Sequence, residues 1–237
     1  MGSANMRNLG FRCIGQMDVS PFLPIGKKLR PTLCLSDTHL LPMRTSYGKD
    51  TPRDLLRLIE ALPNVQLFVL GDFFESLMLS TREIAGLHAS HRIGPLIEAI
   101  RCNLCPKIIP GNHDQRAITF VRRYYGKFAY IGGFRIGRLI FCHGHELGLD
   151  ASHMAERFPL SIAVGGTLDR LGVGVPWGTV TNEAVGAHYH AMGLYAIFGH
   201  THTPIVTRTY ANTGCFLLEY RSCITIEEGM LSLWEGI

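Results

Sequence analysis

Short apolar runs that stop abruptly at polar residues recur along the chain from Leu33 onward. The runs occupy residues 33–35, 67–70, 108–109, 139–142 and 196–198. Continuous apolar runs of this length are typical of strands that are buried on both faces, as in a parallel sheet covered by other layers. The pattern therefore predicts five buried strands, each followed by a polar segment that contains His, Asp or Asn.

Helical periodicity lies between the first three runs. Thr51 and Pro52 begin a predicted helix that ends at Pro63. Residues 81–101 are predicted to form one long helix or two short ones, and residues 115–125 form another. Alternating strands and helices indicate βαβ units, in which ligands bind at the carboxyl ends of the strands.

The pattern changes after residue 200. Strand-like segments at residues 205–210, 215–220 and 230–234 follow one another there, separated by turn residues such as Asn212-Thr213-Gly214. We therefore expect an α/β fold whose last part is mostly β-structure.

Composition and charge exclude several classes of protein. With 237 residues, 46% hydrophobic and 18% charged, the chain is long and apolar enough for one α/β domain and is not disordered. The net charge of +4 is spread along the chain without a dense Lys/Arg block, which disfavours nucleic acid as a partner. A transmembrane span and a signal peptide are not expected, and seven cysteines, an odd number, are expected to be reduced, so the prediction is a cytoplasmic protein.

Each predicted buried strand ends in residues of types that commonly bind metal ions. The segments are Asp37-Thr38-His39, Gly71-Asp72-Phe73-Phe74-Glu75, Gly111-Asn112-His113-Asp114, His143-Gly144-His145 and Gly199-His200-Thr201-His202. Carboxylates, an amide and imidazoles without a thiolate suit Mn²⁺, Fe²⁺, Zn²⁺ or Ni²⁺, and we take Mn²⁺ as the first candidate. So many ligands predict two divalent ions. Asp72 is the predicted bridge, because one carboxylate commonly bridges ions about 3.5–4 Å apart.

The charge of such a centre indicates the reaction. The positive charge of two divalent ions exceeds the negative charge of Asp37 and Asp72. An anionic tetrahedral group and a hydroxide formed at neutral pH complement the remaining positive charge. The expected chemistry is hydrolysis of a phosphate ester by a metal-bound hydroxide. His113 is the predicted general acid for the leaving alkoxide, because Asn112 beside it can ligate a metal. Asp114 is predicted to orient His113 or to raise its pKa.

The order of these motifs is similar to that of a known superfamily. D-x-H, G-D-x-x, G-N-H-D, a lone His and G-H-x-H follow one another between residues 37 and 202, which resembles the calcineurin-like metallophosphoesterases. The resemblance implies a four-layer αββα sandwich with a dinuclear metal centre at the strand ends. It also implies one metal held by Asp37, His39, Asp72 and His202, and another held by Asp72, Asn112, His143 and His200, with His113 as the acid. We prefer His143 to His145 because it directly ends its apolar run.

The second motif separates the subgroups of this superfamily that the chain resembles from those that it does not. Protein Ser/Thr phosphatases continue it with Asp-Arg-Gly, whereas residues 73–76 here contain no Arg. The segment from Gly71 to Glu75 and the later Asn212-Thr213-Gly214 look more like the UDP-2,3-diacylglucosamine pyrophosphate hydrolase group. That group usually has Arg at the position of His113 and Asp at the position of His145, so its lipid substrate is not carried over to this chain.

Three classes of function compete. A small-molecule phosphomonoesterase or phosphodiesterase is favoured, because the chain is too short for a large additional recognition domain. A nuclease of the same superfamily would need an extended cationic surface. A non-catalytic scaffold, like the retromer subunit that lost its catalytic His, is disfavoured by His113 and the complete ligand set. Arg44 and Arg116, near the first and third motifs, are candidate substrate contacts.

The predicted domain organisation is simple. Residues 1–30 are an N-terminal extension, and residues 31–237 form one metallophosphoesterase domain with an insertion at 150–195. A strand crossover needs about a dozen residues, and long insertions are usually functional. The insertion is predicted either to be a lid or to be a helical pair that covers a sheet face. The candidate lid contacts to the non-phosphate part of the substrate are Phe158, Leu160, Leu171 and Trp177.

Overall fold

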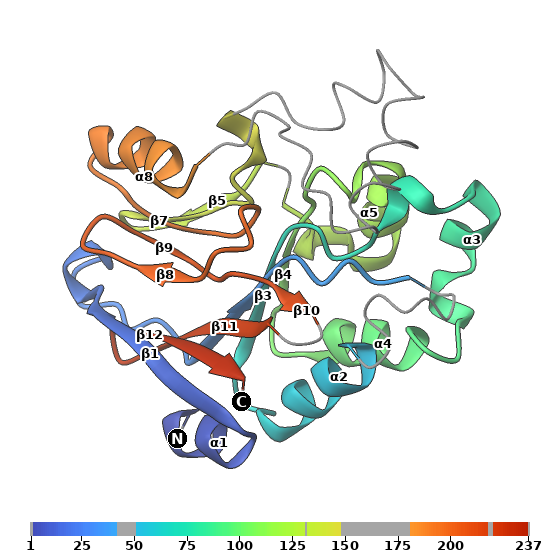
Figure 1. Ribbon diagram of the computed structural model, residues 1–237, viewed down its shortest axis with the longest axis horizontal. Helices are drawn as coiled ribbons and strands as arrows, with labels where there is room; N and C mark the ends of the chain where they lie inside the picture. The colour runs from blue at the N-terminus through green and yellow to red at the C-terminus, as the bar shows by residue number, and fades with distance from the viewer. Residues whose placement is uncertain (1, 42–50, 131, 148–180, 218–219, 237) are drawn as a thin grey trace.

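The computed structural model describes residues 2–41, 51–130, 132–147, 181–217 and 220–236 (Figure 1). Over these ranges two β-sheets lie at the centre, with helices on their outer sides. No helix in the described part of the chain has the length and apolar character that crossing a membrane requires.

The first sheet joins parallel and antiparallel strands. Its order is β1-β12-β11-β2-β3-β4, and β10 pairs with β11 outside this path. Strands β2, β3 and β4 run parallel, whereas β11, β12 and β1 form antiparallel pairs. The strands are β1 (Phe11–Asp18), β2 (Thr32–Leu35), β3 (Gln66–Leu70), β4 (Lys107–Ile109), β10 (Phe216–Leu217), β11 (Tyr220–Glu227) and β12 (Met230–Gly236).

The second sheet has the order β5-β6-β7-β9-β8. Its central strands β6, β7 and β9 are parallel, and β5 and β8 close the two edges as antiparallel strands. The strands are β5 (Phe134–Ile136), β6 (Leu139–Phe141), β7 (Tyr195–Phe198), β8 (Ile205–Val206) and β9 (Tyr210–Asn212).

The helices of the described ranges cover the outer faces of the sheets. They are α1 (Gly2–Asn8), α2 (Thr51–Ala61), α3 (Thr81–Ala85), α4 (Gly94–Cys102), α5 (Ile118–Tyr125) and α8 (Asn182–Ala191). Single turns of 3₁₀ helix in the described ranges are η1 (Ser20–Phe22), η2 (Ser76–Met78), η3 (Leu87–Ala89), η4 (Gln115–Ala117), η5 (Gly126–Phe128) and η6 (His145–Leu147).

Side chains of one strand alternate between two hydrophobic cores. On β2, Leu33 packs in the core beneath α2 and α4, whereas the next residue, Cys34, packs between the two sheets. On β7, Ile197 points into the core between the sheets and Phe198 packs in the core beneath α8. Burial on both faces removes any need for polar positions along these strands. The resulting order of helices, sheet, sheet and helix is the αββα sandwich that the motifs implied, and it is confirmed.

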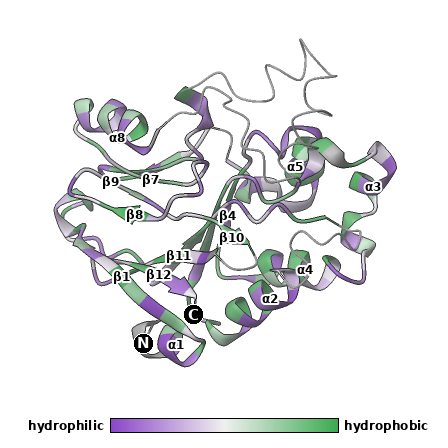
Figure 2. Cartoon of the chain, viewed as in Figure 1, coloured by the Kyte–Doolittle hydropathy of each residue, from purple (hydrophilic) through white to green (hydrophobic). Residues whose placement is uncertain are grey.

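The helices carry a different pattern, because only one face of each is buried. In α2, hydrophobic and hydrophilic positions alternate along the ribbon (Figure 2). Leu55, Leu58 and Ile59 are buried on the side that faces the sheet. The predicted helix between Thr51 and Pro63 is thus confirmed.

Two predicted segments each contain two elements. Residues 81–101 contain the two short helices α3 and α4, which is one of the two predicted alternatives, and Pro95 lies in the first turn of α4. Residues 205–210 do not form one strand, because a turn separates β8 from β9. The Thr207 hydroxyl accepts the backbone N–H groups of Thr209 and Tyr210 and thereby stabilises this turn.

Residues 1–30, the predicted N-terminal extension, contain a strand of the first sheet. β1 pairs with β12 from Phe11 to Asp18 and extends the first sheet by one edge strand. Its buried and partly exposed positions alternate, so it contains no continuous apolar run and the criterion used for the buried strands does not detect it. The boundary at residue 30 stays a prediction.

The predicted insertion lies mostly outside the described residues. These exclude 148–180, and with them Phe158, Leu160, Leu171 and Trp177. The described end of the insertion is α8, whose Val185 and Tyr189 pack on the outer face of the second sheet. This part covers a sheet face, and the lid stays a prediction.

Candidate metal centre

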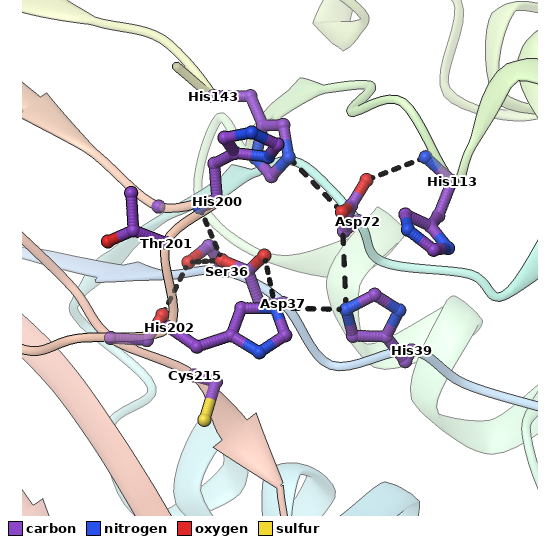
Figure 3. Close-up of polar contacts among 12 residues, drawn as sticks. Ser36, Asp37, His39, Asp72, His113, His143, His200, Thr201, His202 and Cys215 are labelled. Atoms are coloured by element: carbon purple, nitrogen blue, oxygen red, sulfur yellow. Dashed lines mark hydrogen bonds and ion pairs between the residues drawn. The ribbon is translucent and has the colours of Figure 1, made fainter. Parts of the chain in front are cut away.

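The carboxyl ends of the parallel strands bring the predicted metal ligands together. Loops after β2, β3 and β4 of the first sheet meet loops after β6 and β7 of the second sheet (Figure 3). Potential ligand atoms gather there in groups within 4.8 Å of one another. The groups are Asp37 with His39 and His202, Asp72 with His143 and His200, and His39 with Glu75 and His113.

Asp37 anchors the first group. Its Oδ2 accepts hydrogen bonds from the Ser36 hydroxyl and from the His200 backbone N–H. Its buried Oδ1 lies 3.1 Å from His202 Nε2 but has no well-aligned hydrogen bond among the described residues. His202 Nε2 is in turn 3.3 Å from His39 Nε2. A buried carboxylate oxygen and two imidazole nitrogens that face one another fit a shared cation better than a hydrogen-bond network.

His143 anchors the second group. Its Nδ1 lies 2.8 Å from the Leu70 carbonyl, to which it donates, so Nε2 is left to bind a metal. That Nε2 lies 3.2 Å from Asn112 Oδ1 and 3.2 Å from Asp72 Oδ2. The ring centre of His145 lies 5.2 Å from that of His143, and the choice of His143 as the ligand stays a prediction.

Asp72 lies between the two groups. Its Oδ2 is 3.2 Å from His143 Nε2 and 4.0 Å from His39 Nε2. Its Oδ1 accepts the backbone N–H of His113 at 2.8 Å, which fixes the orientation of the carboxylate. One oxygen of Asp72 thus faces ligands of both groups.

The backbone at these ligands is in a conformation that side chains rarely adopt. Positive φ angles occur at Asp37 (52°), His39 (41°), Asp72 (49°), His200 (69°) and His202 (58°). The loops are held in place by each other, because the Asp37 N–H donates to the Gly71 carbonyl and the His39 N–H donates to the Asp72 carbonyl. Such strain persists only where surrounding contacts enforce it, and it concentrates at functional sites.

Two glycines of the motifs lie so close to other site residues that a side chain would not fit there. A Cβ at Gly71, where φ is 93°, would lie 2.2 Å from His143 Nδ1. A Cβ at Gly199 would lie 2.4 Å from Asp37 Oδ2. The glycine before each ligand therefore allows ligands of neighbouring strands to approach one another.

Comparison with known proteins decides the family. The sequence model of the calcineurin-like phosphoesterases matches residues 30–204. The chain belongs to the calcineurin-like phosphoesterase family. It is a metal-dependent hydrolase of phosphate esters.

A solved metallophosphoesterase structure supports the same fold for this phosphoesterase. A metallophosphoesterase from Sphaerobacter thermophilus superposes with a TM-score of 0.50 at 14% identity, over 88% of both chains. A protein of unknown function from Aquifex aeolicus aligns with a TM-score of 0.39 at 18% identity, over 72% of this chain and 78% of the other. Comparison with curated protein sequences gave no match. The resemblance to the UDP-2,3-diacylglucosamine hydrolase group stays a prediction.

Glu75 is a site residue of the phosphoesterase that the sequence motifs did not single out. Its Oε2 lies 2.8 Å from His39 Nδ1, and its Oε1 lies 2.7 Å from His113 Nδ1. The two imidazoles are in edge contact, with ring centres 4.7 Å apart. Burial opposes the charge of Glu75, but hydrogen bonds from His113 and His39 outweigh it and lower the carboxyl pKa to about 2. Glu75 is thus an anion that orients one predicted ligand and the predicted acid.

Asp114 has a different role from the predicted one. Its carboxylate accepts the backbone N–H groups of Phe73, Phe74 and Gly111 at 3.0, 2.7 and 2.9 Å. The side chain therefore joins the loop after β3 to the loop after β4, and Glu75, not Asp114, holds the His113 ring. Burial and the charge of Asp72 raise the pKa of Asp114 to about 7.

Burial and neighbouring charges shift the pKa values of the imidazoles of the phosphoesterase in opposite directions. Burial disfavours the charged ring of His113, yet Asp72 and Glu75 raise its pKa to about 9. Burial is likewise outweighed at His143, where Asp72 raises the pKa to about 10. At His200, burial together with the charge of His143 lowers the pKa to about 4. A bound divalent cation would compete with these protons, because a ligating imidazole must be neutral.

Of the two arginines predicted to contact the substrate, the structure describes Arg116. Arg44 lies outside the described residues. Arg116 is exposed, and its Nη1 donates to the Leu77 carbonyl at 3.2 Å. Glu146 is a second residue that the motifs missed, since its carboxylate accepts the backbone N–H groups of His143 and Gly144. Spacing alone reveals neither glutamate, because Glu75 contacts His39 and His113 from the loop between them in sequence, and Glu146 binds the backbone of its own loop.

Proposed function

We propose that this phosphoesterase hydrolyses a small phosphorylated molecule with the help of two divalent metal ions. The position of Asp72 Oδ2 between ligands of both groups carries the proposal. The first ion would be held by Asp37, His39, Asp72 and His202, and the second by Asp72, Asn112, His143 and His200.

The donor set suits such ions. The seven ligands offer carboxylate, amide and imidazole atoms, which match Mn²⁺ first and also Fe²⁺, Zn²⁺ or Ni²⁺. The buried Oδ1 of Asp37, which has no well-aligned hydrogen bond among the described residues, would gain a cationic partner. When bound, the ions would activate a water molecule and neutralise charge on the phosphate.

His113 would deliver the proton to the leaving group. Its side chain is 28% exposed, whereas His143 is fully buried, so a substrate can reach the His113 ring. Glu75 holds Nδ1, which leaves Nε2 to carry the mobile proton. A pKa raised to about 9 keeps the ring protonated at neutral pH. During ester cleavage, the Nε2 proton would transfer to the departing alkoxide while Nδ1–H stays with Glu75.

Small phosphomonoesters or phosphodiesters are the proposed substrates. The charge of +4 is distributed over the chain and favours a small ester over nucleic acid. The intact His113 and ligand set favour an enzyme over a scaffold. All seven cysteines are free, which fits a reducing compartment such as the cytoplasm.

The test combines metal analysis with parallel assays. The purified protein is analysed for bound metals, then stripped with EDTA and reloaded separately with Mn²⁺, Fe²⁺, Zn²⁺ and Ni²⁺. Each form is assayed on p-nitrophenyl phosphate, bis-p-nitrophenyl phosphate, single-stranded DNA and a nucleotide diphosphate conjugate. We expect two bound ions per chain and metal-dependent cleavage of small esters. Unchanged activity after complete metal removal, or cleavage of DNA alone, would contradict the proposal.

A further inference from the structure

A cavity open to solvent lies among the helices α3, α4 and α5. It has a volume of about 860 Å³ and is lined by residues of these helices and of the short turns next to them. Within the described part of the chain, the residues that line it include none of the proposed metal ligands. A volume of this size is in the range of small-molecule binding sites and far exceeds the needs of a single inorganic ion.

Aromatic rings form one wall of this cavity. Phe120 and Tyr124, one turn apart on α5, are stacked with ring centres 5.3 Å apart and an angle of 14° between the ring planes. His88 stacks on Phe120 with an angle of 21°. All three rings line the cavity. Partly exposed aromatic rings are favourable surfaces for another planar ring.

The polar lining is positively charged. Among the residues that line the cavity are the guanidinium groups of Arg101, Arg116 and Arg123, together with one carboxylate, Glu98. Glu98 is already engaged, because it accepts hydrogen bonds from Arg101 at 2.9 Å and from the Tyr124 hydroxyl. Arg116 and Arg123 have no carboxylate partner among the described residues. Two such guanidinium groups on one cavity favour an anion, and phosphate in particular.

Arg116 connects the cavity to the active site. Arg116 donates a hydrogen bond to the carbonyl of Leu77. The residue before Leu77 is Ser76, and its backbone N–H and its hydroxyl both donate to the His113 carbonyl. The wall of the cavity and the backbone of the proposed acid are therefore parts of one hydrogen-bonded unit made of η2 and η4.

We propose that this cavity is a nucleotide-binding site. A nucleobase packs against the Phe120 and Tyr124 rings, and the attached phosphate binds to Arg116 and Arg123. A sugar phosphate would leave the aromatic wall unused, and a free nucleoside would leave both arginines without an anionic partner. The site is separate from the metal centre, so its existence does not depend on the proposed catalytic mechanism.

Binding to the full-length protein tests this proposal. The probes are phosphonate analogues of AMP and UMP, in which a methylene group replaces the ester oxygen, so that the enzyme cannot hydrolyse them. Isothermal titration calorimetry compares them with adenosine and ribose 5-phosphonate. We expect at least one nucleotide analogue to bind at least about tenfold more tightly than either fragment, because stacking and charged hydrogen bonds each contribute.

Matched variants locate the binding. Arg123→Gln should weaken binding of the nucleotide analogue about tenfold or more, whereas Arg122→Gln, the same change one residue earlier on α5 and outside the cavity, should leave it unchanged. Asp72→Asn, which alters the metal centre, should also leave it unchanged. Thermal unfolding verifies that Arg123→Gln is folded. The proposal is overturned if neither analogue binds, if Arg122→Gln weakens binding as much as Arg123→Gln does, or if Asp72→Asn abolishes binding while Arg123→Gln retains it.

Discussion

Glu75 Oε1 and His113 Nδ1 form a 2.7 Å hydrogen bond at the edge of the metal centre. Through its other oxygen, the same carboxylate also holds His39 at 2.8 Å. One anion thus fixes the ring of a proposed metal ligand and the ring of the proposed acid. Glu75 is a positioning residue, since it acts on the reaction through these two histidines.

Glu75→Gln should lower kcat about 10–100-fold, the range found when an outer partner of a metal-site histidine is removed. Glutamine keeps the size of the side chain but loses the negative charge that helps to raise the pKa of His113. The His113 pKa should therefore fall, and the ring should lose its proton at lower pH. Consequently the alkaline limb of the kcat profile should move to lower pH. A pH–rate profile measures this shift.

The control for this experiment is Glu60→Gln, because Glu60 is exposed on α2. Its profile should match that of the wild type. A Glu75→Gln enzyme with normal kcat and an unshifted profile would show that the hydrogen bond to His113 has no part in proton transfer.

Asp72→Asn and Asp37→Asn should differ in metal content. Asp72 faces ligands of both groups, so its loss should remove most of both ions. Asp37 belongs to the first group, and Asp37→Asn should retain the second ion. Metal analysis by mass spectrometry counts the ions per chain, with the exposed Asp18→Asn as the matched control. Full metal content in Asp72→Asn would exclude a bridging role.

His113→Ala should retain its metal ions yet lower kcat about 10²–10⁴-fold on alkyl phosphates, the usual effect of losing a general acid. The loss should be much smaller on p-nitrophenyl phosphate, because p-nitrophenolate is a stable leaving group. Rates on both esters, measured with metal content, check this expectation. His190→Ala, an exposed change on α8, is the control. Equal losses on good and poor leaving groups would contradict the assignment of the acid.

The clustering of the proposed ligands could be predicted because parallel strands place their carboxyl ends at one edge of the sheet. Asp37 and Asp72 follow adjacent parallel strands, β2 and β3. Buried strands have a strong local signal, since a continuous apolar run leads up to the end of each. That signal locates the strand ends, and the ligands follow directly after them.

The remaining site residues depend on contacts that the local pattern does not contain. Glu75 meets His39 across 36 residues of sequence. Asp114 stands next to His113 in the sequence, but its carboxylate points to the backbone of the loop after β3. Sequence adjacency suggested the wrong partner, because the direction of a loop side chain is set by tertiary hydrogen bonds. β1 was missed for a related reason, since an edge strand needs only alternating burial.

Gly71→Ala should destabilise the protein and lower its metal content, because the new methyl group would lie 2.2 Å from His143 Nδ1. Two costs combine at this position: the backbone has a φ of 93°, and the methyl group occupies the space of a ligand. Gly26→Ala separates the cost of backbone strain from the cost of overpacking. Gly26 also has a positive φ, of 73°. Among the residues that the structure describes, a methyl group added there would meet no atom within 4 Å beyond its two chain neighbours. Strain alone should cost Gly26→Ala about 1 kcal/mol of unfolding free energy, and Gly71→Ala should lose about 1–3 kcal/mol more from overpacking. Denaturant unfolding and metal analysis measure both effects. If the two variants lose equal stability and both keep their metal ions, the close approach of Gly71 to His143 is not required for the site.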